Sequence, residues 1–198
     1  LMAVGHRVVH GGEYFANSAI INDSVIKNIT KCISLSPLHN PANLEGIYQC
    51  RKLLPNTPQV VVFDTAFHQT LPPRAHIYPI AWDLYIKDGI RRYGFHGTSH
   101  RFIAQKAAEL MNKPIEDLAL ITAHLGSGCS AAAILGGISQ DTTMGLTPLE
   151  GLMMGSRSGD VDPALYDFLS NKFGWDIQRI TKELNYNSGL IGVSGISD

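Results

Sequence analysis

The sequence is poor in charge and in cysteine, and it has no long apolar run. Only 17% of its 198 residues are Asp, Glu, Lys or Arg, and the formal net charge is -1. The 16 basic residues are scattered, so no basic field points to nucleic acid or to anionic lipid. The apolar runs fall far short of the roughly 20 residues needed to span a bilayer. We therefore expect neither nucleic acid nor a membrane as a partner.

The cysteines Cys32, Cys50 and Cys129 are odd in number and form no CxxC motif. This disfavours a disulfide framework and is typical of a reduced chain with buried thiols. The first residues contain no basic region followed by an apolar one, so no secretory signal is visible. Together these features predict a cytoplasmic location.

Strand and helix patterns alternate along the chain, which predicts an α/β fold. Apolar, β-branched runs predict strands at about 2–9, 59–65, 118–125, 129–135 and 137–143. Helical spacing and capping signals predict helices at about 22–33, 40–54, 82–88, 98–112, 163–173 and 176–184. Apart from the helix at 82–88, residues 66–96 have no clean period and are predicted as a long loop. The change in composition near 65–67 predicts a domain boundary there, between 1–66 and 67–198.

The helix at 98–112 has the strongest pattern. Thr98 or Ser99 is predicted as its N-cap. Its apolar face is predicted to contain Phe102, Ile103, Ala107 and Leu110.

The segment "AHLGSGCS", residues 123–130, lies between two predicted strands. Gly126 and Gly128 permit unusual backbone angles and remove the Cβ atoms that would block a ligand. Successive N–H groups in such a turn can bind phosphate oxygens. An ordinary hairpin turn is the alternative, and the segment matches neither a P-loop nor GxGxxG.

Each of the predicted strands at 2–9 and 59–65 contains a charged residue that is a candidate for function. Asp64 ends the buried run "VVVFD", at the sheet edge where α/β proteins place their chemistry. The alternative is that it caps a turn. Arg7 interrupts an apolar strand and needs an anion, either a ligand or a carboxylate such as Glu13.

Three histidines lie in motif-like surroundings. His96 and His100 in "YGFHGTSH" are four residues apart, but the glutamate of HExxH is absent and Gly97 separates His96 from the helix. This disfavours a metal site. His96 is instead a candidate hydrogen-bond donor to a ligand, and His100 a capping or structural residue. His39 lies in a loop made rigid by prolines, and alone it is an ordinary loop histidine.

Arg157 is the only arginine of the segment 145–164, "GLTPLEGLMMGSRSGDVDPA". Its glycine and serine neighbours predict a mobile backbone, which would let the guanidinium close over a bound anion in bidentate fashion. The alternative is a salt bridge to Asp160 or Asp162, which would contribute little if exposed.

Six segments together resemble the acetate kinases: "GHRVVHGGE", "PLHNPAN", "FDTAFHQTLP", "RRYGFHGTSH", "HLGSGCS" and "DTTMGLTPLEGLMMGSRSGDVDP". They match that family's signature segments in order and at similar spacing, over essentially the whole chain. The related propionate and butyrate kinases share this plan.

The resemblance implies an actin-like, sugar-kinase-type (ribonuclease H-like) fold of two domains, incomplete in this chain, with ATP bound between them. It also implies reversible transfer of phosphate from ATP to acetate, with Mg²⁺ or Mn²⁺, in a homodimer. Propionate is the alternative acid, since one methylene changes binding by only about 1–3 kcal/mol. A non-catalytic actin-like module that binds nucleotide and mediates dimerisation is an alternative of another class, and a metal hydrolase is disfavoured by the histidine spacing.

The resemblance also implies a role for each matching residue. Those implied in catalysis are Asp64, His96, Arg157 and His39. Those implied in substrate binding are Arg7, Val9, Leu38, Phe95 and Pro148. Those implied in binding ATP are His124, Leu125, Gly126, Ser127 and Gly128. Asp64 is expected to orient Mg²⁺ indirectly or to orient the substrate, and no direct metal ligand is expected within this chain.

The sequence departs from the family pattern in two respects. Position 127 is serine where asparagine is expected, which puts a side-chain contact to phosphate in doubt. The family's amino-terminal phosphate-binding strand and its carboxy-terminal adenosine segment, with a Mg²⁺-binding glutamate, have no counterpart here. We therefore expect the chain to be the middle of such an enzyme and to be nearly inactive by itself.

Overall fold

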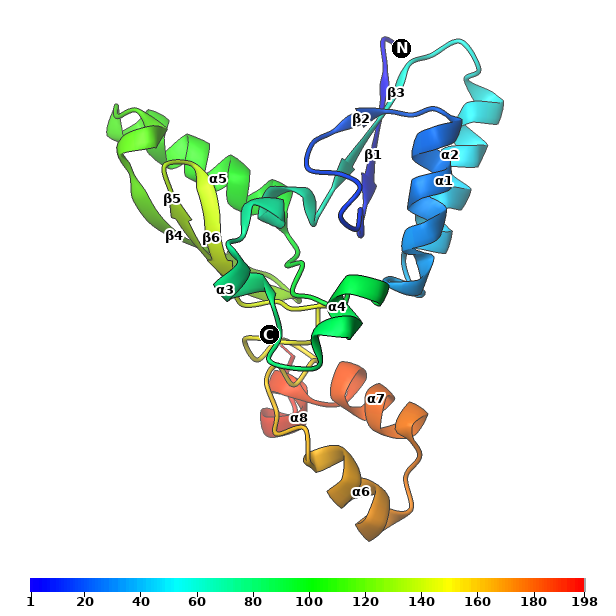
Figure 1. The fold of residues 1–198 in the computed structure, drawn as a ribbon, viewed down its shortest axis with the longest axis vertical. Helices are drawn as coiled ribbons and strands as arrows, with labels where there is room; N and C mark the ends of the chain where they lie inside the picture. The colour runs from blue at the N-terminus through cyan, green and yellow to red at the C-terminus, as the bar shows by residue number, and fades with distance from the viewer. Residues whose placement is uncertain (198) are drawn as a thin grey trace.

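The computed structural model describes residues 1–197, which fold into two small sheets and a set of helices (Figure 1). The strands are β1 (Val4–Val8), β2 (Ala19–Ile20), β3 (Gln59–Phe63), β4 (Ala119–Leu125), β5 (Cys129–Leu135) and β6 (Ile138–Thr142). The helices are α1 (Asp23–Lys31), α2 (Asn40–Leu53), α3 (Pro73–His76), α4 (Trp82–Asp88), α5 (Gly97–Met111), α6 (Leu165–Phe173), α7 (Ile177–Tyr186) and α8 (Gly189–Ser194). The predicted α/β class is confirmed.

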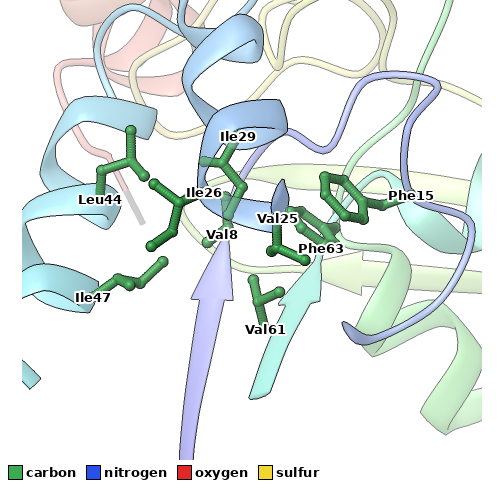
Figure 2. Close-up of a cluster of buried hydrophobic side chains, with 9 residues drawn as sticks. All are labelled: Val8, Phe15, Val25, Ile26, Ile29, Leu44, Ile47, Val61 and Phe63. Carbon is green, nitrogen blue, oxygen red and sulfur yellow. The ribbon is translucent and has the colours of Figure 1, made fainter. Parts of the chain in front are cut away.

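The first sheet has the strand order β1-β3-β2, with β1 parallel and β2 antiparallel to β3. Helices α1 and α2 lie side by side against it (Figure 1). Between sheet and helices lies a core of nine buried side chains, which Figure 2 shows: Val8, Phe15, Val25, Ile26, Ile29, Leu44, Ile47, Val61 and Phe63. This core fixes β1 and β3, and therefore the residues at their carboxyl ends.

The second sheet is an antiparallel meander, β4-β5-β6, with α5 along one face. The predicted face of α5 is wrong, because Phe102, Ile103 and Leu110 are largely exposed. The buried residues are Gly97, His100, Ala104 and Ala108, the last three spaced four apart, and the small side chains of Ala104 and Ala108 let the helix lie close to the strands.

Segment 66–96, predicted mainly as a loop, also contains a 3₁₀ helix at Ala66–Thr70 and the short helix α3. Helices α6, α7 and α8 form a group of their own below the two sheets (Figure 1). No helix among residues 1–197 is both long and apolar enough to cross a bilayer.

Gly97 begins α5 where it meets the first sheet. Its N–H donates to the backbone oxygen of Asp64 (2.9 Å). A Cβ at Gly97 would collide with that oxygen and lie 2.9 Å from Cβ of Phe67. We therefore expect Gly97→Ala to lower the free energy of unfolding by about 1–3 kcal/mol, measured by urea denaturation.

Gly46 provides the matched control, since it lies within α2 and a Cβ there would meet nothing within 4 Å. Gly46→Ala should stabilise the chain by up to about 1 kcal/mol through helix propensity. Equal effects at the two positions would show that the contact with Asp64 does not constrain Gly97.

Candidate functional site

The candidate site begins with an ion pair at the carboxyl ends of β1 and β3. Arg7 donates from Nε to Oδ1 of Asp64 (2.8 Å) and from Nη2 to Oδ2 (2.5 Å). The Asp64 side chain is 3% exposed, whereas that of Arg7 is 63% exposed. The carboxylate raises the pKa of Arg7, chiefly through these hydrogen bonds. The sequence left either a ligand or a carboxylate such as Glu13 as the anion for Arg7. The structure shows a carboxylate, but it is that of Asp64. Glu13 pairs with Arg91 instead.

The glycine segment forms the turn between β4 and β5, so it is a hairpin turn as well as a candidate ligand loop. Gly126 N–H donates to the oxygen of Gly128 (3.1 Å). A Cβ at Gly128 would lie 3.3 Å from Nε2 of His96 and 3.5 Å from Nη1 of Arg157. The side chains of His96 and Arg157 therefore both approach the turn at Gly128. A Cβ at this position would contact both of them.

His96 is held in an uncommon conformation beside this turn. It is the N-cap of α5 and has a φ of 58°, in the left-handed region. Its ring stacks on that of His124 (centroids 3.9 Å apart), and its Nδ1 lies 2.9 Å from Oγ of Ser130. The predicted Thr98 or Ser99 cap is wrong, because Ser99 Oγ contacts Nδ1 of His124 instead (2.9 Å).

A second group of candidate residues surrounds a cavity of about 440 Å³. Its lining includes Leu38, His39, Pro148 and Arg157, and it also includes Tyr166 and Tyr186 from α6 and α7. The exposed His39 thus lines one cavity with Arg157 although 118 positions separate them. The other catalytic candidates, Asp64 and His96, do not line it.

Arg157 connects the cavity with two further candidates, the partly buried Val9 and the buried Phe95. Its Nη1 donates to the oxygen of Pro148 (3.2 Å) and contacts Sδ of Met154 (3.7 Å). Met154 belongs to a buried cluster with Phe95, against which Val9 packs. The guanidinium therefore lies between the cavity, this apolar cluster and the glycine turn.

The backbone around Arg157 is held firmly, contrary to the mobile segment that its glycines and serines predicted. Gly155 N–H donates to the oxygen of Ser127 (3.2 Å), and Ser188 N–H donates to the oxygen of Ser156 (3.1 Å). Gly189, with a φ of +65°, fits against the oxygens of Met154 and Arg157. The alternative salt bridge is also absent among the described residues, since Asp160 and Asp162 accept from backbone N–H groups instead.

The sequence analysis missed Ser130, Gly189 and the two cavity tyrosines. Gly189 carried a signal, because "NSGL" resembles a turn, and the structure begins a short helix within it. Tyr166 and Tyr186 carried none, since each belongs to an ordinary amphipathic helix. Their position in the cavity wall depends on how α6 and α7 lie relative to residues 35–39, which line the same cavity.

These residues do not assemble a metal site. Within residues 1–197, no group of three or more His, Cys, Asp or Glu side chains is arranged to hold a metal ion. Both carboxylate oxygens of Asp64 are engaged by Arg7. We therefore assign no step to a metal held by these side chains.

Four buried or partly buried histidines should make the stability of the chain depend on pH. Burial lowers the pKa of His10, His96 and His100 to about 4 and that of His68 to about 3. Well above pH 6.5 they are neutral in the folded and the unfolded chain. As the pH falls from about 6.5 to 4, the unfolded chain binds protons that the folded chain does not, so stability is lost across this window.

We expect the free energy of unfolding, measured by urea denaturation, to fall by several kcal/mol between pH 7 and pH 5. Each fully buried histidine contributes up to about 1.4 kcal/mol per pH unit, and the more accessible His96 contributes less. His68→Gln should reduce the slope of the free energy of unfolding against pH by the amount that corresponds to about one bound proton. A flat profile between pH 6.5 and 5 would contradict the burial of these rings.

The class of protein follows from comparison with solved structures. The chain superposes over its whole length on a propionate kinase from Francisella tularensis (TM-score 0.96, 50% identity, 51% of that chain). It superposes equally on the acetate kinase of Porphyromonas gingivalis (TM-score 0.96, 51% identity, 50% of that chain). The fold is thus that of acetate and propionate kinases.

The chain belongs to the Acetokinase family, whose model matches residues 1–198. It is 60% identical over 196 residues to the acetate kinase of Halothermothrix orenii, covering 99% of this chain and 49% of that protein. It is 55% identical over 198 residues to the acetate kinase of Carboxydothermus hydrogenoformans, covering 50% of that protein. The chain therefore spans about half the length of the curated relatives it matches.

Proposed function

We propose that this chain supplies part of the active site of a kinase that transfers phosphate reversibly from ATP to acetate, giving acetyl phosphate and ADP. The observation that carries the proposal is the approach of Arg157 Nη1 and His96 Nε2 to the same glycine of the β4–β5 turn. Phosphoryl transfer depends mainly on positioning and on stabilising charge on the transferred group. A guanidinium and an imidazole beside a glycine turn are suited to that task.

Each candidate residue has a proposed role in this reaction. Arg157 and His96 stabilise the transferred phosphoryl group, and the exposed His39 lies beside it. Arg7, oriented by Asp64, binds the acid's carboxylate or the phosphate. The acid is already an anion at pH 7 and is its own nucleophile, so Asp64 is not needed as a base. Turn residues His124, Leu125, Gly126, Ser127 and Gly128 bind ATP phosphates, and Val9, Leu38, Phe95 and Pro148 line the pocket for the methyl group.

His96 acts in this proposal as a neutral hydrogen-bond donor. Its pKa is lowered to about 4, chiefly by burial and next by the neighbouring His124. The positive charge at the transferred group therefore comes from arginine side chains and from the Mg²⁺ or Mn²⁺ that accompanies ATP in such reactions.

The remaining features of the proposal rest on the family. Residues 1–66 and 67–198 belong to different actin-like domains, the active protein is a homodimer, and it works in the cytoplasm. Propionate is the second candidate acid, because the F. tularensis propionate kinase matches this chain as well as the P. gingivalis acetate kinase does.

The test is acyl phosphate formation from ATP and Mg²⁺ with acetate, propionate and butyrate. It is run on the protein encoded by the full reading frame that contains this sequence and on the 198-residue chain alone. We expect activity from the full protein, with acetate or propionate preferred, and little from the chain. A folded full protein that binds ATP but forms no acyl phosphate would favour a non-catalytic nucleotide-binding module.

A further inference from the structure

The hydroxyl of Ser130 lies between two imidazole rings. Its Oγ is 2.9 Å from Nδ1 of His96 and 2.8 Å from Nε2 of His100. Ser130 is fully buried in β5, immediately beyond the glycine turn. On the other side of His100, Oγ1 of the buried Thr122 in β4 is 2.7 Å from Nδ1 of the ring. His96, Ser130, His100 and Thr122 thus form a row of hydrogen-bonded side chains.

The four groups can share their protons in three ways. Both imidazoles are neutral at pH 7, because burial lowers the pKa of each to about 4. A neutral imidazole has one N–H donor and one acceptor, and a hydroxyl has one proton. Ser130 either donates to one imidazole while accepting from the other, in one direction or the reverse, or accepts from both imidazoles.

Thr122 and Ser130 together select one of the three arrangements. His100 is the only hydrogen-bond partner of its hydroxyl within residues 1–197. If Thr122 accepts from His100, its own buried proton has no acceptor, which costs about 1–3 kcal/mol. If Thr122 donates, His100 donates from Nε2 to Ser130. The buried proton of Ser130 then needs an acceptor, and Nδ1 of His96 is the remaining partner of this hydroxyl within residues 1–197, so Ser130 donates to it. The protons of Thr122, His100 and Ser130 are then all paired, and the proton of His96 is on Nε2.

We propose that Ser130, with Thr122 and His100 behind it, is a positioning residue that holds His96 in the Nε2–H tautomer facing Gly128 and Arg157. The role of this tautomer rests on the proposed function, since a donor at Nε2 suits a phosphoryl oxygen between His96 and Arg157. The tautomer itself is a property of the folded chain without substrate. Ser130 touches no reacting atom and acts through His96.

The first test is the tautomer, read from imidazole ¹⁵N shifts of the labelled 198-residue chain at pH 7, with His96→Asn to assign the signals. We expect a proton on Nε2 of His96 in the unaltered chain and a mixture of tautomers in Ser130→Ala. Thr122→Val, which does not touch His96, should give the same mixture, and Thr122→Ser should restore the single tautomer. His68 is an internal reference, because its Nε2 must donate to the oxygen of Phe95 (3.1 Å).

Thr142→Val is the matched control, since it removes another buried hydroxyl of the same sheet, one that donates to the oxygen of Ala131 (3.1 Å). It should leave the His96 tautomer unchanged. A proton on Nδ1 of His96 in the unaltered chain, or a tautomer unaffected by Ser130→Ala and Thr122→Val, would overturn the proposal.

The second test measures kinetics in the full protein. Ser130→Ala and Thr122→Val should each lower kcat roughly 10- to 100-fold while KM changes little, and Thr122→Ser should recover most of the loss. The expected tautomers with unchanged kcat would overturn the catalytic importance of the row. The expected tautomers in a protein without kinase activity would instead overturn the proposed function and leave the positioning of His96 intact.

Discussion

Arg157→Ala should lower the rate of acetyl phosphate formation by about 10³-fold or more in the full protein, with the fold retained. An arginine that stabilises a transferring phosphoryl group contributes roughly 10³–10⁵ in rate, or about 4–7 kcal/mol. Arg157 has no ion-pair partner among the described residues, and it donates only to an oxygen and a sulfur. Its charge is therefore available to a ligand.

The control for this prediction is an arginine in an exposed ion pair. Arg179 contacts Glu183 one turn further along α7 (3.5 Å), with 51% of its side chain exposed. Arg179→Ala should change the rate less than twofold and the stability by less than about 1 kcal/mol. Arg157→Lys should recover only part of the lost activity, because an ammonium cannot donate in bidentate fashion. A loss below tenfold in a folded Arg157→Ala protein would exclude the proposed role.

The second large effect concerns stability, and the two partners of the Arg7–Asp64 pair should differ. Arg7→Ala leaves a carboxylate that is 3% exposed without a partner, and we expect it to cost about 3–5 kcal/mol at pH 7. Asp64→Asn leaves an arginine that is 63% exposed and already hydrated, so it should cost only about 1–2 kcal/mol. Urea denaturation of both variants measures this asymmetry.

The double variant Arg7→Ala/Asp64→Asn separates pairing from other effects. Because it no longer buries an unpaired charge, it should be more stable than Arg7→Ala alone. Asp64→Asn should still lower activity by roughly 100-fold, since Arg7 loses the pair of hydrogen bonds to the carboxylate that orients it. Equal losses of stability in the two single variants would show that burial of the carboxylate does not govern the pair.

Local patterns predicted the positions of the main strands and helices, but not which face of α5 is buried. The large side chains Phe102, Ile103 and Leu110 suggested an apolar face by their spacing. The sheet instead accepts the small residues Ala104 and Ala108, and no property of the helix alone indicates that choice. A close approach between helix and sheet depends on both surfaces.

The site was predictable to different degrees. Arg7 pairs with Val62 in the parallel register of β1 and β3, and Asp64 is two residues further on, hence on the same face. The Arg7–Asp64 contact could thus have been inferred once the strands were paired. The restraints on Arg157 come from residues 127 and 188–191. Ser130 in β5 meets two histidines at the start of α5. Such contacts arise only from the tertiary fold.

The two sheets also differ in the stretch of chain that must come together to form them. Leu125 pairs with Cys129, whereas Val4 pairs with Gln59 after two helices have intervened. Closing the longer loop costs more conformational entropy, so the meander β4-β5-β6 can assemble locally while the β1–β3 pair forms slowly. During synthesis β1 leaves the ribosome first and then waits for β3. Until β3 follows, the apolar side chain of Val8 lacks the neighbouring strand with which it is buried in the folded core.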